Sequence, residues 1–392
     1  MQTLFRYGQV GGCQLNQKSR RPTESQKLPE LIIQITIMKI KSVRAWAEKL
    51  PLTKTYVIAY KTIGDTEIVF LEVVLENGLT GLGAANPFAD VVGETPEVTL
   101  ANLQSGYLDG WVGQDIRHFN QLIGQAAAHF PKLPGTLAAI DIALHDLFCQ
   151  YIGIPIVDFY GRKIQALPTS VTLGIKDTAA MLEEAKEYYK LGFKILKIKT
   201  GLDVDQDIER AITLTDHFKG KMIIRVDANQ GYTIAQLQHF LRSTQGYGVE
   251  LIEQPMKVGL ETELAGLTAE ERSLLVADES LLNAGSALQL SHPPTPYGVF
   301  NIKLMKSGGI TGAKEIAVIA KNADNQLFWG CNDESIVSIA AALHAAYSCG
   351  NTKYLDLDGS FDLSKDLVEG GFTLKDGCMI TNGLPGLGVK RL

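Results

Sequence analysis

The sequence has few cysteines, no long apolar run and no strong net charge, and each absence excludes a class of protein. Five cysteines in 392 residues form no CxxC pair and are too few for a disulfide framework, which indicates a reducing, cytoplasmic location. No run reaches the roughly 18 apolar residues of a membrane span. The net charge of −6, with acids and bases interspersed, offers nucleic acid no basic stripe. We therefore expect a cytoplasmic protein that binds neither membranes nor nucleic acid.

Three common cofactor motifs are also missing. No GxGxxG turn is present, so a dinucleotide-binding Rossmann fold is disfavoured. The seven histidines form no HxH or HExxH pattern, which argues against zinc. Asp203, Asp205 and Asp207 imitate a calcium loop, but Ile208 stands where that loop needs glycine and Leu214 where it needs glutamate. These acids are predicted to start a solvated helix instead.

The length of 392 residues suggests two or three structural units. Residues 1–37 lack periodicity and are predicted to be a disordered extension or an upstream mis-start before Met38. Alternating segments at 38–47, 67–76 and 79–84, the last two joined by Asn77-Gly78, predict an antiparallel meander, and residues 96–150 predict helices. The expected domains are an α+β N-terminal capping domain (38–160), an α/β domain (161–360) and a C-terminal segment that returns to the cap (361–392).

Eight apolar segments alternate with helical patterns in the middle of the chain, which favours a parallel sheet with crossover helices. The expected strands are 168–174, 194–199, 221–227, 249–253, 274–278, 298–303, 326–330 and 353–357. The charged ends of five successive strands, from Lys199 to Lys303, are 25 to 28 residues apart, which is one strand, one helix and two loops. The predicted fold is therefore a (β/α)8-type barrel, in which the loops after the strands surround one cavity.

Three successive strands end in acids: Asp227, Glu253 and Asp278. At the mouth of a barrel their carboxylates would lie close together and repel one another. A hard divalent cation removes that cost, and Mg²⁺ suits carboxylate oxygens together with water and substrate. One such acid alone is as well explained as a loop acid or a helix cap. Three in register predict a magnesium site.

Lysines end the strands on either side of these acids, Lys199 before them and Lys303 after them. Strand alternation places Lys197 and Lys199 in the barrel interior, with Lys194 expected nearer its bottom. A nearby cation lowers the pKa of a lysine and makes it a better base. We expect Lys199 to act as a base, and Lys306 in the following loop is the rival to Lys303 as the second site lysine. The alternative for Lys199 and Lys303 is a structural lysine held in a salt bridge.

Two further acids, Asp356 and Asp358, share a face at the end of the eighth strand and could bind a substrate ammonium group or form a strand-end turn with Gly359. Asp333, after the seventh strand, is a candidate site residue or the N-cap of the next helix.

Together these residues resemble the enolase superfamily over residues 38 to about 390, and the KxK run at 197–199 with the acidic trio and Lys303 resembles its muconate lactonizing subgroup. The Asp356-Leu357-Asp358 pair and the stretch 301–309 are similar to dipeptide epimerases such as the L-Ala-D/L-Glu epimerases. The resemblance implies one Mg²⁺ per subunit, a homo-oligomer, and a dipeptide whose α-ammonium is held by the two aspartates. It also implies 1,1-proton transfer at the C-terminal residue through an enediolate, with Lys199 and Lys303 on opposite faces.

Departures from the family pattern bear on the substrate. Glutamate-selective relatives place an arginine in the first capping loop, where this chain has Tyr60-Lys61. Asp333 falls where several relatives carry an apolar side chain, which favours a cationic or polar residue in the substrate, such as a basic dipeptide. The alternatives are an N-acylamino acid racemase, an o-succinylbenzoate synthase, a muconate-type cycloisomerase, or a binding protein that kept the fold without the chemistry.

Overall fold

The computed structural model describes residues 38–58 and 61–392, and within this range it describes no side chains for residues 56–63. The predicted disordered extension or mis-start, residues 1–37, lies outside the described residues. Met38–Leu392 forms one compact unit, and the boundaries predicted within it, at 160 and 360, remain predictions. None of the helices in the described ranges has the length and apolar character needed to cross a bilayer.

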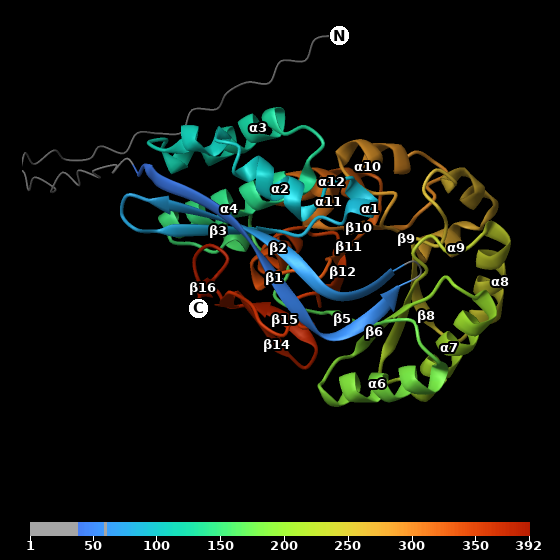
Figure 1. Ribbon diagram of the computed structural model, residues 1–392. Coiled ribbons are helices and arrows are strands. Elements are labelled where there is room, and N and C mark those ends of the chain that lie inside the picture. Colours follow the sequence, from blue (N-terminus) through green and yellow to red (C-terminus); the bar gives the residue numbers. More distant parts are fainter. Residues whose placement is uncertain (1–37, 59–60) are drawn as a thin grey trace, which may run out of the picture. The chain divides into compact units, whose positions relative to one another are not determined.

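The capping sheet is antiparallel, in the order β1-β2-β3. Its strands are β1 (Ile40–Ile58), β2 (Lys61–Leu75) and β3 (Thr80–Ala85). The predicted turn between the last two strands is present: Gly78 has a φ of 89°, and the side-chain oxygen of Asn77 accepts a hydrogen bond from Leu79 N at 3.0 Å. The first two strands extend further than their apolar alternation predicts, because β1 and β2 keep pairing with each other beyond the core. The extra length carries this hairpin toward the barrel (Figure 1).

One long helix, α4 (Pro134–Ile152), packs against this sheet. The other cap helices are α1 (Ala89–Val92), α2 (Pro96–Leu103), α3 (Phe119–His129) and α5 (Ile156–Phe159), with 3-10 turns at Tyr107–Trp111 and Ile116–His118. Two glycines of β3 allow the close approach: a Cβ on Gly81 would lie 2.3 Å from Ala143 O, and one on Gly83 would lie 1.9 Å from Ala139 O. The packing of strand on helix therefore excludes side chains at both positions.

Replacing Gly83 by alanine is expected to lower the free energy of unfolding by about 1–3 kcal/mol, because the added methyl group must displace α4 from β3. Gly124 in α3 is the matched control, since a Cβ there meets no atom within 4 Å, and Gly124→Ala should leave stability unchanged or slightly raise it. Urea unfolding followed by circular dichroism measures both. Equal effects of the two substitutions would contradict the close packing.

The eight predicted parallel strands are all present and follow one another in the order β5 to β12. They are β5 (Ser170–Leu173), β6 (Ile195–Lys199), β7 (Ile223–Asp227), β8 (Val249–Glu253), β9 (Leu275–Ala277), β10 (Val299–Ile302), β11 (Gln326–Gly330) and β12 (Thr352–Asp356). A parallel bridge between Thr169 and Leu355 joins the last strand to the start of the first. The (β/α)8-type barrel with an α+β cap is thereby confirmed.

Helices connect the strands on the outside of the barrel (Figure 1). They are α6 (Thr178–Lys190), α7 (Val204–His217), α8 (Ile234–Thr244), α9 (Ala269–Ser273), α10 (Ala284–Leu290), α11 (Leu304–Ser307), α12 (Ile310–Asn322) and α13 (Ile336–Tyr347), with a 3-10 turn at Glu261–Gly266. The Asp203 carboxylate accepts hydrogen bonds from Asp205 N at 3.0 Å and Gln206 N at 3.1 Å. The acids that imitate a calcium loop therefore lie at the start of α7, as predicted, but Asp207 is buried rather than solvated.

The C-terminal segment ties the cap to the barrel. Its strands are β13 (Val368–Gly370), β14 (Phe372–Lys375), β15 (Cys378–Thr381) and β16 (Val389–Arg391), and β15 pairs with β4 (Leu167–Pro168). Before these strands, Asp362 O accepts from Thr53 N at 2.7 Å and Ser364 N donates to Pro51 O at 2.9 Å. These two bonds fix the β1–β2 hairpin beside the loop that follows β12, at the end of the barrel where the predicted site lies.

Candidate active site

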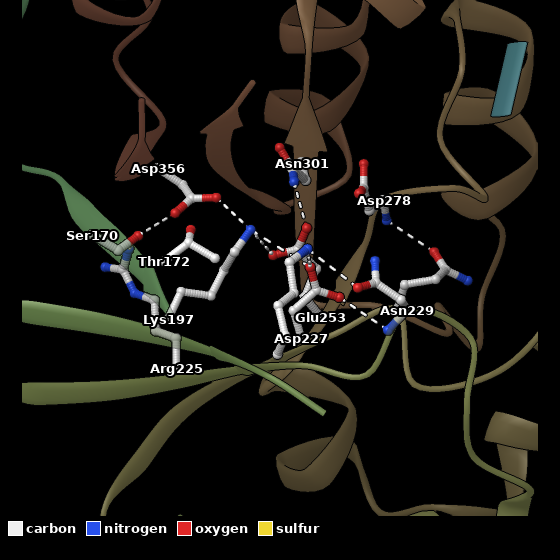
Figure 2. Close-up of polar contacts among 12 residues, drawn as sticks. Ser170, Thr172, Lys197, Arg225, Asp227, Asn229, Glu253, Asp278, Asn301 and Asp356 are labelled. Atoms are coloured by element: carbon white, nitrogen blue, oxygen red, sulfur yellow. Dashed lines mark hydrogen bonds and ion pairs between the residues drawn. The ribbon is translucent and has the colours of Figure 1, made fainter. Parts of the chain in front are cut away.

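Strand β6 delivers two lysines to the barrel interior. Lys197 Nζ lies 3.3 Å from Glu253 Oε2 and also pairs with Asp356 (Figure 2). Lys199 Nζ donates to Asp227 Oδ2 at 2.7 Å and to Asn229 Oδ1 at 3.2 Å. Lys194, expected near the bottom of the interior, is instead exposed, with its ammonium 5.0 Å from the centre of the Tyr189 ring. It precedes the strand and has the opposite parity to Lys197, so that prediction was wrong.

The three predicted acids end three neighbouring strands. Asp227 and Glu253 are register partners on β7 and β8, and Asp278 follows β9 directly. All three are at most 3% exposed. Burial, then the charges of Asp227 and Asp278, raise the pKa of Glu253 to about 8, partly offset by Lys197. The carboxylates therefore act on one another in a buried space, where a cation would relieve their repulsion.

Each of the three carboxylates forms an ion pair with a lysine ammonium group. Asp278 pairs with Lys303 at 2.9 Å and with Lys306, and these two lysines hold the pKa of Asp278 well below its usual range in spite of its burial. In the part of the chain that the structure describes, no three acidic, histidine or cysteine side chains already surround one point as metal ligands. The donors are nonetheless the hard oxygens that Mg²⁺ prefers. A cation among them would compete with the lysines for the same oxygens.

Exposure separates the four lysines into two pairs. The side chains of Lys199 and Lys303 are 13% and 14% exposed, whereas those of Lys197 and Lys306 are 4% and 5% exposed. Burial lowers the pKa of Lys303, but Asp278 and Glu253 outweigh this effect and raise it above its ordinary value. Only Lys199 and Lys303 of these four present an appreciable surface to a ligand.

Lys306, the rival to Lys303, lies inside the site. Its Nζ donates to Asp278 O at 2.6 Å and to Asn301 O at 3.1 Å, because the short helix α11 turns it back toward β9 and β10. Burial lowers the pKa of Lys306 more than Asp278 raises it. Its three acceptors fix its position, so it anchors Asp278.

Three polar residues of the site were missed by the sequence reasoning. Asn301 Nδ2 donates to Glu253 Oε1 at 2.8 Å (Figure 2). Asn229 links Lys199 to Glu279, because its Nδ2 lies 3.3 Å from Glu279 Oε1. Glu279 Oε2 is buried without a hydrogen-bond partner. Asn229 and Glu279 each follow a predicted strand-end acid closely, which is the signal that could have identified them.

The two acids at the end of β12 are buried at the barrel mouth. Asp356 pairs with Lys197 and accepts from Ser170 Oγ at 2.5 Å. Asp358 Oδ2 accepts from Thr172 N at 2.7 Å. Burial and the charge of Asp356 raise the pKa of Asp358 to about 6. Both carboxylates are held by polar contacts from neighbouring strands, and each is close enough to the cavity to line it.

Asp333 lies between the cap and the barrel. Its backbone oxygen accepts from Asn86 Nδ2 at 2.7 Å and from Thr66 Oγ1 at 3.2 Å, both from the cap. The N-cap of α13 is Ser335, whose hydroxyl accepts from Val337 N, so the alternative of Asp333 as that cap was wrong. Tyr60 lies outside the described residues, as does the side chain of Lys61.

Two adjoining cavities meet at the exposed lysines. The larger, about 460 Å³, extends toward the cap and is also lined by Asp278 and Glu279. The smaller, about 110 Å³, is lined by Asp356 and Asp358. Lys199, Lys303, Cys331, Asn332 and Asp333 line both. We call these the cap lobe and the aspartate lobe; a ligand that spans them would place its middle between Lys199 and Lys303.

Comparisons with known proteins identify the family to which the chain belongs. Residues 40–161 match the mandelate racemase / muconate lactonizing enzyme N-terminal domain, and residues 180–391 match the enolase C-terminal domain-like family. An L-Lys-D/L-Arg epimerase of Desulforapulum autotrophicum is 50% identical over 355 residues, which are 91% of this chain and 100% of the relative.

Two solved structures resemble the chain over most of its length. The dipeptide epimerase of Methylococcus capsulatus, complexed with Mg and L-Arg-D-Lys, has a TM-score of 0.88 and 46% identity, covering 90% of this chain and 99% of that one. The dipeptide epimerase of Enterococcus faecalis, complexed with Mg and L-Leu-L-Tyr, has a TM-score of 0.83 and 33% identity, covering 90% and 100%. The chain therefore belongs to the mandelate racemase / muconate lactonizing enzyme family of the enolase superfamily, among its dipeptide epimerases.

Proposed function

We propose that this protein is a Mg²⁺-dependent epimerase of dipeptides with cationic side chains, and that it inverts the α-carbon of the C-terminal residue. The observation that carries the proposal is the position of Lys199 and Lys303. Lys199 ends β6 and Lys303 directly follows β10, they are the more exposed pair among the four lysines around the acids, and both line both lobes. An α-carbon between them has one amine on each face, so one lysine can remove the proton and the other can return it to the opposite face.

Asp227, Glu253 and Asp278 would hold one Mg²⁺ per subunit. When bound, the ion supplies positive charge beside the substrate carboxylate as the adjacent carbon loses its proton. With a cation bound, Asp227 and Asp278 would have another positive partner. Lys199 would then be released from Asp227, and Lys303 from Asp278. A lysine without its carboxylate partner has a lower pKa and is a better base. Lys197, held by Asp356 and Glu253, supplies a fixed positive charge next to the acids.

The two lobes support a dipeptide as the substrate. Asp356 and Asp358 place negative charge in the aspartate lobe, where a free α-ammonium group would bind, and the cap lobe leaves room for the C-terminal side chain. Two relatives support the cationic preference. The relative from D. autotrophicum is named an L-Lys-D/L-Arg epimerase, and the structure from M. capsulatus is complexed with L-Arg-D-Lys. A homo-oligomeric assembly stays a prediction.

The proposal is tested by incubating the purified protein with L-Lys-L-Arg and Mg²⁺ and separating the products by chiral chromatography. We expect conversion to L-Lys-D-Arg until the two diastereomers reach equilibrium, and no conversion in EDTA. L-Ala-L-Glu is the comparison substrate and should react more slowly. Faster conversion of L-Ala-L-Glu would contradict the cationic preference, and conversion in EDTA would contradict the role of the metal.

Mg²⁺ is expected to stabilise the folded protein, by about 2.7 kcal/mol when its free concentration is 100 times its dissociation constant. Glu253→Gln should abolish this stabilisation. Glu250→Gln on the same strand is the matched control, because Glu250 pairs with Arg225 at 2.7 Å away from the acidic trio, and it should keep the response to Mg²⁺. Thermal unfolding with and without Mg²⁺ measures the effect. A full Mg²⁺ response in Glu253→Gln would show that the ion binds elsewhere.

A further inference from the structure

The aspartate lobe contains carboxylates that form no ion pair with a described residue, although acids and lysines line it in equal number. Its lining contains five acidic residues and five lysines. The acids are Glu184, Asp333, Asp356, Asp358 and Asp362, and the lysines are Lys54, Lys176, Lys197, Lys199 and Lys303. The numbers are equal, so the net charge that a ligand meets depends on which of these groups are already paired.

Most of the lysines are directed to other partners. Lys197 pairs with Asp356. Lys176 and Lys54 pair with Glu184, the latter at 3.5 Å, at the edge of the lobe. Lys199 and Lys303 are bound to Asp227 and Asp278, which do not line this lobe. Their charges are therefore balanced by carboxylates other than Asp358 and Asp362.

Asp358 and Asp362 remain without an ion pair to any described lysine, arginine or histidine. Asp358 begins a turn that is closed by a hydrogen bond of 2.8 Å from Phe361 N to Asp358 O, and Asp362 directly follows this turn. Burial, followed by the charge of Asp358, raises the pKa of Asp362 to about 7. Burial, followed by the charges of Asp362, Glu184 and Asp358, raises the pKa of Tyr188, which also lines the lobe. Two carboxylates and a phenol ring thus crowd together where a cation would be stabilised.

The backbone at Asp362 is fixed by the cap. Its carbonyl accepts from Thr53 N at 2.7 Å, and the next residue, Leu363, forms a bridge with Leu52 of β1. The Asp362 carboxylate itself makes no hydrogen bond with a described residue. It is therefore held at the wall of the lobe with its acceptor atoms available to a ligand.

We infer that Asp362 binds the cationic side chain of the substrate's N-terminal residue, while Asp358 with Asp356 binds the α-ammonium group of that residue. The inference rests on the proposed function. An N-terminal lysine or arginine brings two positive groups to two uncompensated carboxylates, whereas an N-terminal alanine brings one. The wall of the aspartate lobe therefore selects the first residue of the dipeptide, and the aromatic face of Tyr188 offers an additional contact to a guanidinium group.

The test compares L-Arg-L-Lys with L-Ala-L-Lys, which differ only at the N-terminal side chain. The kcat/KM of α-proton exchange is measured in heavy water with Mg²⁺. Asp362→Asn should lower kcat/KM for L-Arg-L-Lys by about 10- to 100-fold and change it less than about threefold for L-Ala-L-Lys, because a charge-assisted hydrogen bond contributes only to the first. Asp362→Glu should retain most of the preference.

Glu187→Gln is the matched control. Glu187 is an exposed acid of α6 that pairs with Lys54 at 3.4 Å and does not line the lobe, so both rates should be unchanged. An equal loss for both dipeptides in Asp362→Asn, or an unchanged preference, would overturn the role of Asp362 and leave the epimerase proposal standing. Absence of exchange in every dipeptide with the wild-type protein would contradict both proposals.

Discussion

Replacing Lys303 by alanine is expected to lower the rate of epimerisation by roughly 10²–10⁴-fold, and replacing Lys199 should have an effect of the same size. Each lysine is the only amine proposed on its face of the α-carbon, so without it the proton cannot be returned to that face. The remaining lysine can still remove and replace a proton on its own side. Each variant should therefore exchange the α-proton of one diastereomer with solvent, and the two variants should retain opposite diastereomers.

The measurement is the initial rate of deuterium incorporation from heavy water, with L-Lys-L-Arg and L-Lys-D-Arg as separate substrates. Lys321→Ala, at an exposed position of α12, is the control and should behave as the wild-type protein does. Loss of exchange for both diastereomers in both variants would argue against one base on each face. Retained epimerisation in Lys303→Ala would point to Lys306, which lies on the same carboxylate of Asp278.

Replacing Asp358 by asparagine is expected to lower kcat/KM for L-Lys-L-Arg by about 10²-fold, because the α-ammonium group loses a buried carboxylate partner. Asp358 is a cleaner test than Asp356, whose removal would also take from the buried Lys197 the carboxylate that lies nearest to it. Acetylating the α-amino group of the substrate should lower the kcat/KM of the wild-type enzyme by a similar factor. In Asp358→Asn the same acetylation should lower kcat/KM little further, since the substitution and the acetylation remove the same interaction.

Urea unfolding of Asp358→Asn is the accompanying control, since the carboxylate also accepts a hydrogen bond from Thr172 N. Full activity of Asp358→Asn, or rapid turnover of the acetylated substrate by the wild-type protein, would favour the alternatives whose substrates lack a free ammonium. Those are N-acylamino acid racemisation, o-succinylbenzoate synthesis and muconate cycloisomerisation. In the proposed function, the pair of aspartates in the aspartate lobe is the feature that separates these reactions from dipeptide epimerisation.

The barrel could be predicted from the sequence because its strands are short apolar runs at nearly constant spacing. Asp227, Glu253 and Lys199 lie on such runs, so their place at the mouth follows from the register. Lys194 was misplaced because only two of the three lysines in its run share a parity. Lys306 was undervalued because a one-turn helix, α11, brings it back to Asp278, and a single turn leaves no periodicity to read.

The aspartate lobe was harder to predict because it is built from distant segments. Asp362 comes from the turn after β12, Tyr188 from α6 and Lys54 from the capping hairpin. The hairpin extends past its apolar alternation, so no sequence pattern indicates that Thr53 would donate to Asp362 O. Which acids are left unpaired depends on these tertiary contacts, and only the structure gives them.

The most direct test of the central claim is a mass-spectrometric screen of pooled L,L-dipeptides in heavy water with Mg²⁺. The proposed function predicts the gain of one deuteron at the α-carbon of the C-terminal residue, largest in dipeptides of lysine and arginine. The absence of any gain, with Mg²⁺ bound, would contradict dipeptide epimerisation and direct attention to N-acyl and succinyl substrates.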